Sequence, residues 1–279
     1  MHADWMIPDW PAPAGVRAVF TTRQGGVSRA PFGSMNLGDH VGDQPAQVLA
    51  NRARLQSAIG SRPVFLKQVH GSEVLALKSD TLDGKSADAS ITSQRQLACT
   101  IMVADCLPVL LTLGDGSMVA AAHAGWRGLA GAGSMAGKDI LESVIESFRH
   151  LAQVEPARTA IKIIAWLGPC IGPSAFEVGA EVKATFELSD PAAGRFFAAT
   201  AQGKYLADLP GLARLRLQAL GVTVVYGNDG SPPWCTVSNP SQFFSHRRDA
   251  AVGPGNGFGN GFGTGFGTTG RMAACIWRV

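Results

Sequence analysis

The sequence predicts an α+β fold in which mixed sheets are covered by helices, and three observations lead to this class. Strand-like runs come in clusters and do not alternate strictly with helices. Hydrophobic residues make up 46% and charged residues 16% of the 279 residues, so a sizeable buried core is expected. No change in composition marks a boundary, so we expect a single domain over residues 1–279.

Nine apolar runs, bounded by turn residues, have the character of strands. They are Val16–Thr22, Pro63–Val69, Ser72–Leu77, Leu97–Val103, Val109–Leu113, Ser117–His123, Ala160–Leu167, Val222–Tyr226 and Met272–Val279. Because several of these runs follow one another with only short connections, they predict strands paired within mixed sheets.

Three segments have helical signals. Asp43, followed by Pro45 in the first turn, predicts the start of a helix that runs to about Ile59. Apolar residues recur every three or four positions over 140–151, which predicts an amphipathic helix. A third helix is predicted to begin near Asp208 and Pro210. These helices would cover the sheets.

Composition and charge exclude several classes of protein. The net charge of +3 is mild and no long basic block is present, so a nucleic-acid-binding stripe is not expected. No apolar run reaches the ~18 residues that a membrane-spanning helix requires. The N-terminal segment lacks a signal-peptide pattern, and the five cysteines form no C-x-x-C pair, so we expect a cytoplasmic protein without a disulfide framework.

One segment, residues 253–270, stands apart from the rest of the chain. It reads GPGNGFGNGFGTGFGTTG, with a phenylalanine at every fourth position in its middle. Glycine at this density cannot hold a packed backbone cheaply, so we expect a flexible surface insertion. The alternative is a loop whose phenylalanines dock on the body of the protein or on a second copy.

Two histidines and a cysteine are the first candidates for a site. His70, in QVHG, and His123, in AAAHAGWRG, each follow an apolar strand-like run and stand where a strand opens into a loop. Cys106, in VADCLPVLL, lies at a similar break. If these strand ends converge, the three side chains match a catalytic zinc site with one open position. The alternative is three unrelated core or loop residues.

Cationic and polar loop residues are the second group of candidates. Arg127 lies among glycines after His123, where close backbone approach and a helix start would suit an anion, although tight helix packing explains the glycines equally well. The other candidates occupy loops that follow strands or aromatic clusters, where binding residues are often found. They are Arg23, Asn36, Cys170, Arg247 and Arg248.

Taken together, nine segments resemble one family. They are FTTRQGGVS, SMNLGDHVGD, KQVHG, ADASIT, VADCLPVLL, AAAHAGWRG, LGPCIGPSAFEVG, FFSHRRD and TGRMAACIW, in this order from Val16 to Trp277. They are similar to the YfiH-type purine nucleoside phosphorylases, which were earlier described as polyphenol oxidases or laccase-domain proteins. The resemblance implies a layered α/β/β/α domain, with mixed sheets flanked by helices, and a bacterial role also linked to peptidoglycan precursor editing.

The resemblance also implies a chemistry. It gives zinc held by His70, Cys106 and His123, with phosphorolysis of adenosine, inosine and methylthioadenosine, and deamination of adenosine. Asp105 is then expected to orient a ligand or carry a proton. Arg23, and either Arg247 or Arg248, would hold phosphate. Nucleosides and phosphate are the expected partners, nucleic acid and membranes are not, and the chain is expected to be a monomer or weak homodimer.

Two features depart from the family pattern. His246 stands where the family usually has tyrosine before the two arginines, which puts the role of that loop in doubt. The glycine- and phenylalanine-rich insertion separates the RRD and TGR segments, which are normally closer. It would lengthen a loop near the expected pocket and change access or self-association.

Three rival functions are weighed against the phosphorylase. A multicopper oxidase needs roughly ten histidines for four copper ions, whereas this chain has six, so copper is not expected. A cysteine-dependent amidase-like hydrolase would use Cys106 as nucleophile, His70 or His123 as base and Asp105 as orienter, and would suit peptidoglycan precursors. A binding module without catalysis would use the glycine-rich loop as its contact.

Overall fold

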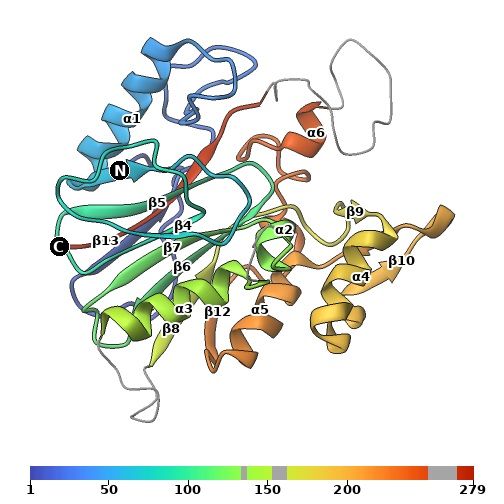
Figure 1. The fold of residues 1–279 in the computed structure, drawn as a ribbon. Helices are drawn as coiled ribbons and strands as arrows, with labels where there is room; N and C mark the ends of the chain where they lie inside the picture. The colour runs from blue at the N-terminus through green and yellow to red at the C-terminus, as the bar shows by residue number, and fades with distance from the viewer. Residues whose placement is uncertain (133–136, 153–161, 251–268) are drawn as a thin grey trace.

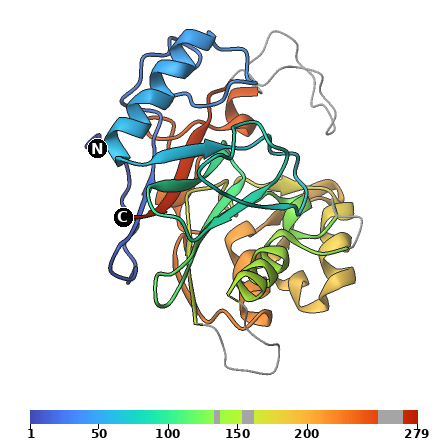
Figure 2. The ribbon, with the colours of Figure 1, turned by 60° about the vertical axis from the view of Figure 1, so that its left-hand side comes forward.

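The computed structural model describes residues 1–132, 137–152, 162–250 and 269–279. Nearly all of the glycine- and phenylalanine-rich insertion expected at 253–270 lies outside these residues. Within them, two sheets are stacked between layers of helices, an α/β/β/α arrangement (Figures 1 and 2). The predicted fold class of mixed sheets flanked by helices is therefore confirmed.

The first sheet has four strands in the order β1-β13-β5-β2. Their bounds are β1 Val16–Phe20, β2 Arg62–Phe65, β5 Leu97–Val103 and β13 Met272–Arg278. β13 pairs antiparallel with both β1 and β5, whereas β2 pairs parallel with β5. The chain's last strand thus lies between its first strand and a central one, which ties distant parts of the sequence together.

The second sheet has six strands in the order β12-β8-β6-β7-β4-β3. Their bounds are β3 Val74–Ala76, β4 Ala89–Thr92, β6 Leu107–Leu113, β7 Val119–Ala124, β8 Ile163–Leu167 and β12 Val224–Gly227. A small third sheet, β10-β11-β9, is made of strands Phe197–Ala199, Tyr205–Ala207 and Glu177–Val178. β4 and the small sheet were not expected from the sequence.

Side chains of β5 alternate between two apolar cores, which explains why a sheet lies on one side of this strand and a helix on the other. In β5, Cys99, Ile101 and Val103 pack toward the second sheet, while Ala98 and Met102 pack with Leu55 and Ile59 of helix α1 (Pro45–Ile59). Successive side chains on a strand point to opposite faces, so one strand supplies both cores. α1 therefore covers the outer face of the four-stranded sheet (Figure 1).

Most of the other helices cover the outer face of the six-stranded sheet. The predicted amphipathic helix is α3 (Ile140–Leu151), which buries Leu141, Val144 and Phe148 there. The remaining helical elements are α2 Trp126–Leu129, α4 Ala180–Ser189, α5 Leu209–Ala219 and α6 His246–Ala250, with short 3₁₀ turns Pro191–Phe196, Ala201–Gly203 and Pro232–Trp234. Among the described residues, no helix has the length and hydropathy needed to cross a membrane.

The helix starts test the predicted N-caps. Asp208 caps α5 as predicted, accepting a hydrogen bond from the Gly211 N–H at 2.9 Å. α1 begins at Pro45 after Gln44, which makes no side-chain cap, so the prediction that Asp43 starts the helix is wrong by one position. The Asp43 carboxylate instead accepts from Ser28 and Asn36 in the neighbouring loop.

Candidate metal centre

His70 is presented by a tight turn after β2. Its backbone has a φ of 61°, which is uncommon for a residue other than glycine. The turn is fixed by one carboxylate, because the N–H groups of Val69, His70 and Gly71 all donate to Asp88, at 3.1, 2.9 and 2.7 Å. The exposed His70 side chain is therefore held at a defined place by its own backbone.

Cys106 and His123 come from neighbouring strands. Cys106 immediately precedes β6, and β6 pairs antiparallel with β7 so that Leu107 faces Ala124 and Pro108 faces His123. This register brings Cys106 opposite the loop that follows β7. His123 is buried, with 3% of its surface exposed. Two separate apolar runs thus bring their polar ends to one edge of the sheet.

The three side chains meet as the strand-end argument expected. One ligand atom from each of His70, Cys106 and His123 lies within 4.8 Å of the others. The His70 Nε2 is 3.9 Å from the Cys106 Sγ. The two imidazole rings stand edge to face, with centroids 4.7 Å apart. Among the described residues this is the only group of three or more such side chains that could hold a metal ion.

Asp88 supports the cluster from behind. It is fully buried, and one of its oxygens lies 2.9 Å from the His123 Nδ1. Burial opposes its ionisation, but the hydrogen bond and charge of His123 and the bonds from Gly71 and Val69 outweigh this, and the pKa of Asp88 is lowered. A carboxylate at Nδ1 leaves Nε2 free to bind a metal, which is the usual way that proteins orient a ligating histidine.

Gly125 leaves the space in which the cluster sits. A Cβ at this position would come within 3.0 Å of the Cys106 Sγ and 3.1 Å of the His70 ring. Gly125 is also the N-cap of α2, whose Trp126–Leu129 turn begins directly after β7. The HAGWRG segment therefore has a glycine where the backbone closely approaches two candidate ligands.

The electrostatics favour a Cys106 thiolate. Burial raises the pKa of this thiol, but the charge of His123 and hydrogen bonds from both imidazoles overcome it and lower the pKa to about 6. Conversely, burial disfavours the charged form of His123, yet the thiolate and Asp88 raise its pKa to about 9. A divalent cation bound in place of the imidazole protons would stabilise the Cys106 thiolate in the same way.

The donor set fits a metal ion. In a tetrahedral zinc site with bonds of about 2.0–2.3 Å, a nitrogen and a sulfur ligand are about 3.6 Å apart. The observed 3.9 Å between the His70 Nε2 and the Cys106 Sγ is close to this value. Three protein ligands leave a fourth position for substrate or water, which is the pattern of catalytic zinc sites.

Asp105 does not have the position that the sequence analysis gave it. Its carboxylate accepts from the Thr236 hydroxyl and from the backbone N–H of Arg247, both at 2.6 Å. The carboxylate that accepts from the His123 Nδ1 is Asp88, so the expectation of Asp105 as the ligand orienter is corrected. Asp105 instead ties the segment before Cys106 to the start of α6.

Three of the candidate arginines are committed to backbone carbonyls. Arg23 donates to Gly33 and Pro240. Every nitrogen of the Arg248 guanidinium donates, to Thr236, Val237, Phe243 and Asp249. Arg247 reaches Ala175 and Glu177 with its two terminal nitrogens. These contacts fasten loops together and leave few donors for a phosphate, contrary to what was expected of Arg23, Arg247 and Arg248.

The remaining candidates differ in access. Arg127 is exposed and stacks on Trp126, with its guanidinium carbon 4.6 Å from the ring centre. Asn36 is buried and uses its amide on Gly38, Asp43 and the Arg271 N–H. Cys170 is buried and burial raises its pKa well above the usual value, so it has no access to substrate. Only Arg127 keeps a solvent-facing side chain.

Two residues near the cluster were missed as site candidates. Asp88 lies in the ADASIT segment and Arg271 in the TGRMAACIW segment, both of which were noted only for their resemblance. The signal for Asp88 was an acidic residue between alanines just before a buried strand, β4. Buried carboxylates need partners, and this one has four.

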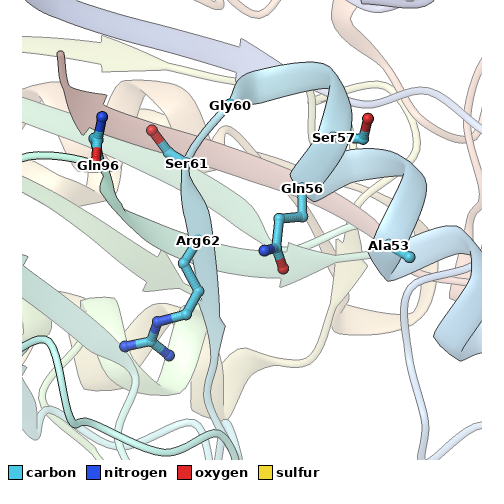
Figure 3. A pocket seen from close by; sticks show the side chains of 7 residues that line it. All are labelled: Ala53, Gln56, Ser57, Gly60, Ser61, Arg62 and Gln96. Carbon is cyan, nitrogen blue, oxygen red and sulfur yellow. The ribbon is translucent and has the colours of Figure 1, made fainter.

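Two surface hollows lie away from the cluster. The larger, of about 510 Å³, is lined by seven residues around the end of α1 and β2, among them Gln56, Arg62 and Gln96 (Figure 3). The other, of about 440 Å³, lies between β3 and α3. Neither is lined by a cluster residue, and none of the chemistry-bearing groups described above opens into them.

The fold and the cluster together define a class, a layered α+β protein with a His–Cys–His centre at the edge of a sheet. Residues 17–279 match the family described as multi-copper polyphenol oxidoreductase laccase, and the chain belongs to this family. It is similar to a Pseudomonas aeruginosa protein named purine nucleoside phosphorylase, at 46% identity over 89% of this chain and 95% of that one. It is 43% identical to the Escherichia coli purine nucleoside phosphorylase YfiH over 98% of both chains.

Solved structures agree with the fold. A crystal structure of a Neisseria meningitidis protein matches with a TM-score of 0.80 at 41% identity, covering 99% of each chain. The crystal structure of YlmD from Geobacillus stearothermophilus matches with a TM-score of 0.81 at 30% identity, covering 100% of this chain and 97% of that one. The family expected from the nine segments is thus confirmed.

Proposed function

We propose that this chain is a zinc-dependent purine nucleoside phosphorylase that also deaminates adenosine. The observation that carries the proposal is the His70–Cys106–His123 cluster, buttressed by Asp88, in a chain whose relatives at 40–46% identity are named purine nucleoside phosphorylase. The substrates are then adenosine, inosine or methylthioadenosine, with inorganic phosphate. The single-domain organisation and the monomer or weak dimer belong to the same proposal.

The chain's own groups have defined tasks in this reaction. A phosphate oxygen forms a bond to C1′ of the ribose while the C1′–N9 bond breaks, and its electron pair leaves with the purine, which takes up a proton. Zinc held by His70, Cys106 and His123 would supply a Lewis acid to this reaction. Asp88 keeps the Nε2 of His123 directed at the centre, and the exposed His70 marks the side open to substrate. Arg127 is an exposed cation in the turn that follows His123.

Product analysis tests this function directly. Zinc-verified protein is incubated with adenosine, with and without phosphate, and the products are separated by liquid chromatography. Adenine formed only with phosphate supports phosphorolysis. Inosine in either tube supports deamination, in which water adds at C6 and the C6–N bond breaks to release ammonia. Absence of both products contradicts the proposal. Metal analysis of the same sample distinguishes zinc from copper, which the family description names.

A second candidate function is favoured by one observation. Cys106, His123 and Asp88 form a chain of thiol, imidazole and carboxylate, and the pKa of the thiol is lowered to about 6. This is the arrangement of an activated cysteine nucleophile with an oriented base. We therefore keep a cysteine-dependent amidase-like hydrolase acting on peptidoglycan precursors as the alternative, with Asp88 in the place first given to Asp105.

Mass spectrometry separates the two functions. A hydrolase would give a covalent acyl adduct on Cys106 when mixed with an amide substrate, and its activity would not need zinc. A phosphorylase would give no acyl adduct, and zinc would protect Cys106 from iodoacetamide. Turnover that survives zinc removal contradicts the phosphorylase, whereas turnover lost with the metal and restored by it contradicts the hydrolase.

A further inference from the structure

Arg271 stands at the same end of the sheets as Cys106. It immediately precedes β13, and the antiparallel register pairs Met272 with Val103, the last residue of β5. Continuing this register sets Arg271 beside the short Ala104–Asp105 segment that leads from β5 into Cys106. Figure 1 shows the beginning of β13 next to α6, at the side of the sheets where α2 also lies. Arg271 is thus a neighbour of the metal centre by topology.

The Arg271 backbone and side-chain stem are held firmly. Its N–H donates to the Asn36 Oδ1 at 2.9 Å, and its carbonyl accepts from the Leu37 N–H at 3.0 Å. The stem lies against Gly38, where a Cβ would come within 2.8 Å of the Arg271 Cγ. The buried Asn36 therefore positions an arginine instead of binding substrate itself.

One edge of the Arg271 guanidinium is left for a ligand. Nη1 donates to the carbonyls of Thr269 and Gly270, at 3.0 and 3.2 Å, which uses both of its hydrogens. Within the described part of the chain, Nε and Nη2 have no hydrogen-bond acceptor. These two nitrogens form the flat fork that grips two oxygens of a phosphate or carboxylate. Arg23 and Arg248 have no such edge, because Nε of each already donates.

The charge of Arg271 is only partly matched by the protein. Burial lowers its pKa, with Cys106 and Asp105 acting in the opposite direction. Burial and then the Arg271 charge also lower the pKa of both His40 and His246. Asp105 is already bonded to Thr236 and Arg247. A half-buried cation that faces two neutral imidazoles, and whose acidic neighbour Asp105 already has partners, stabilises an incoming anion.

We propose that Arg271 binds the phosphate substrate through the Nε–Nη2 edge, beside the His70–Cys106–His123 centre. This inference rests on the proposed phosphorylase function and assigns its phosphate site to a residue other than Arg23, Arg247 or Arg248. The guanidinium holds two oxygens that do not react, which directs a third toward the ribose. A planar fork suits this task better than an ammonium group would.

Phosphate binding to variants tests the assignment. Arg271→Gln and Arg271→Lys are compared with wild type and with Arg149→Gln, an exposed arginine on α3 whose terminal nitrogen only meets the Leu220 carbonyl at 3.4 Å. Inorganic phosphate is titrated into zinc-loaded protein by calorimetry. We expect Arg271→Gln to weaken phosphate binding about 10- to 100-fold, since bonds to charged groups are lost. Arg271→Lys keeps the charge but not the fork, so its loss is expected to be intermediate.

Further readouts separate a local effect from a general one. Zinc content, the thermal midpoint and the KM for adenosine are expected to stay near wild type in Arg271→Lys, while the KM for phosphate rises. If Arg271→Gln does not fold, Arg271→Lys still decides. Arg149→Gln is expected to match wild type in every measurement, which shows that removal of any arginine is not sufficient.

The outcomes distinguish this inference from the proposed function. If wild type releases adenine with phosphate, and Arg271→Lys or Arg271→Gln binds phosphate as tightly as wild type, the assignment of Arg271 is wrong and the function stands. If wild type neither binds inorganic phosphate nor releases adenine, the phosphorylase function is wrong and the Arg271 assignment is overturned with it. Selective loss of phosphate affinity in the Arg271 variants supports both.

Discussion

The pKa of a cysteine thiol is shifted in opposite directions in two regions of the molecule. Within the four-stranded sheet, Cys99 and Cys275 are fully buried, and burial raises the pKa of each to about 12. At the edge of the six-stranded sheet, Cys106 is also largely enclosed, yet its pKa is lowered to about 6. Burial raises the thiol pKa in both regions, so the two imidazoles at the sheet edge account for the lower pKa of Cys106.

This difference in thiol pKa shows which part of the fold can form a reactive or metal-binding site. Inside β5 and β13, each side chain faces one of two apolar cores, and the Cys99 Sγ has the Val119 carbonyl at 3.6 Å as a weak partner. At the ends of β6 and β7 the chain leaves the ladder and several loops meet. Polar groups from different segments are brought together there, and the pKa of the Cys106 thiol is lowered.

Replacement of each cysteine gives the largest contrast. Cys106→Ala removes one of the three candidate ligands. If the proposed function holds, we expect bound zinc to fall from about one per chain to near zero, with at least a 100-fold loss of phosphorolysis. Cys99→Ala, the matched control in the sheet interior, is expected to keep its metal. Metal analysis by mass spectrometry and adenine release measure both. If Cys106→Ala kept its full metal content and turnover, Cys106 would contribute no more to the site than the interior Cys99.

The support behind His123 gives the next largest effect. Asp88→Asn keeps the shape but replaces the carboxylate that accepts from Nδ1 and from three backbone N–H groups. We expect zinc affinity to fall about 10- to 100-fold, the usual consequence of losing such a partner. Competition with a chelator measures it. Asp105→Asn serves as the control, because its carboxylate contacts Thr236 and Arg247 instead.

Much of the architecture was predictable from local pattern. The predicted strand Leu97–Val103 has the bounds of β5, and the period of α3 was clear because its apolar residues face one core. β4 and α4 were missed because β4 has only four residues and α4 buries only Val182 and Phe186. Short or weakly amphipathic elements are held by tertiary packing, which a single sequence does not display.

The site was predictable in part, for a related reason. His70, Cys106 and His123 stand at strand ends, a feature that is visible along the sequence, so their convergence was expected before the fold was known. Asp88 accepts from the N–H groups of Val69, His70 and Gly71, which are 17 to 19 residues away, and contacts the His123 ring 35 residues away. The Arg271 N–H donates to the Asn36 side chain 235 residues away. Pairings between such distant segments leave no mark in a single sequence. The three candidate ligands were therefore found from the sequence, whereas the carboxylate that contacts His123 was sought at Asp105 and lies at Asp88.

Thiol labelling of metal-free protein sharpens the comparison without any change of sequence. The reactive species is the thiolate, whose fraction rises as the pH rises through the pKa. With a pKa of about 6, Cys106 is expected to reach its full rate of alkylation by iodoacetamide near neutral pH. The alkylation rate of an ordinary thiol, whose pKa is about 8.5, would still be rising above neutral pH. Cys99 and Cys275 are expected to stay unlabelled in the folded protein. If the alkylation rate of Cys106 has its midpoint at or above pH about 8.5, the imidazoles do not lower the pKa of this thiol.

The smallest effect is expected at the interior cysteine, and it shows what that region contributes. Cys99 is 0% exposed and packs between the two sheets, where its sulfur fills space and makes one weak hydrogen bond. Cys99→Ala leaves a cavity of about one atom, so we expect a loss of about 1 kcal/mol in the free energy of unfolding. Chemical denaturation of the zinc-loaded protein measures it, with zinc content and adenine release unchanged. If Cys99→Ala instead lost metal, packing between the sheets would determine the geometry of the sheet edge, and the two regions would not be independent.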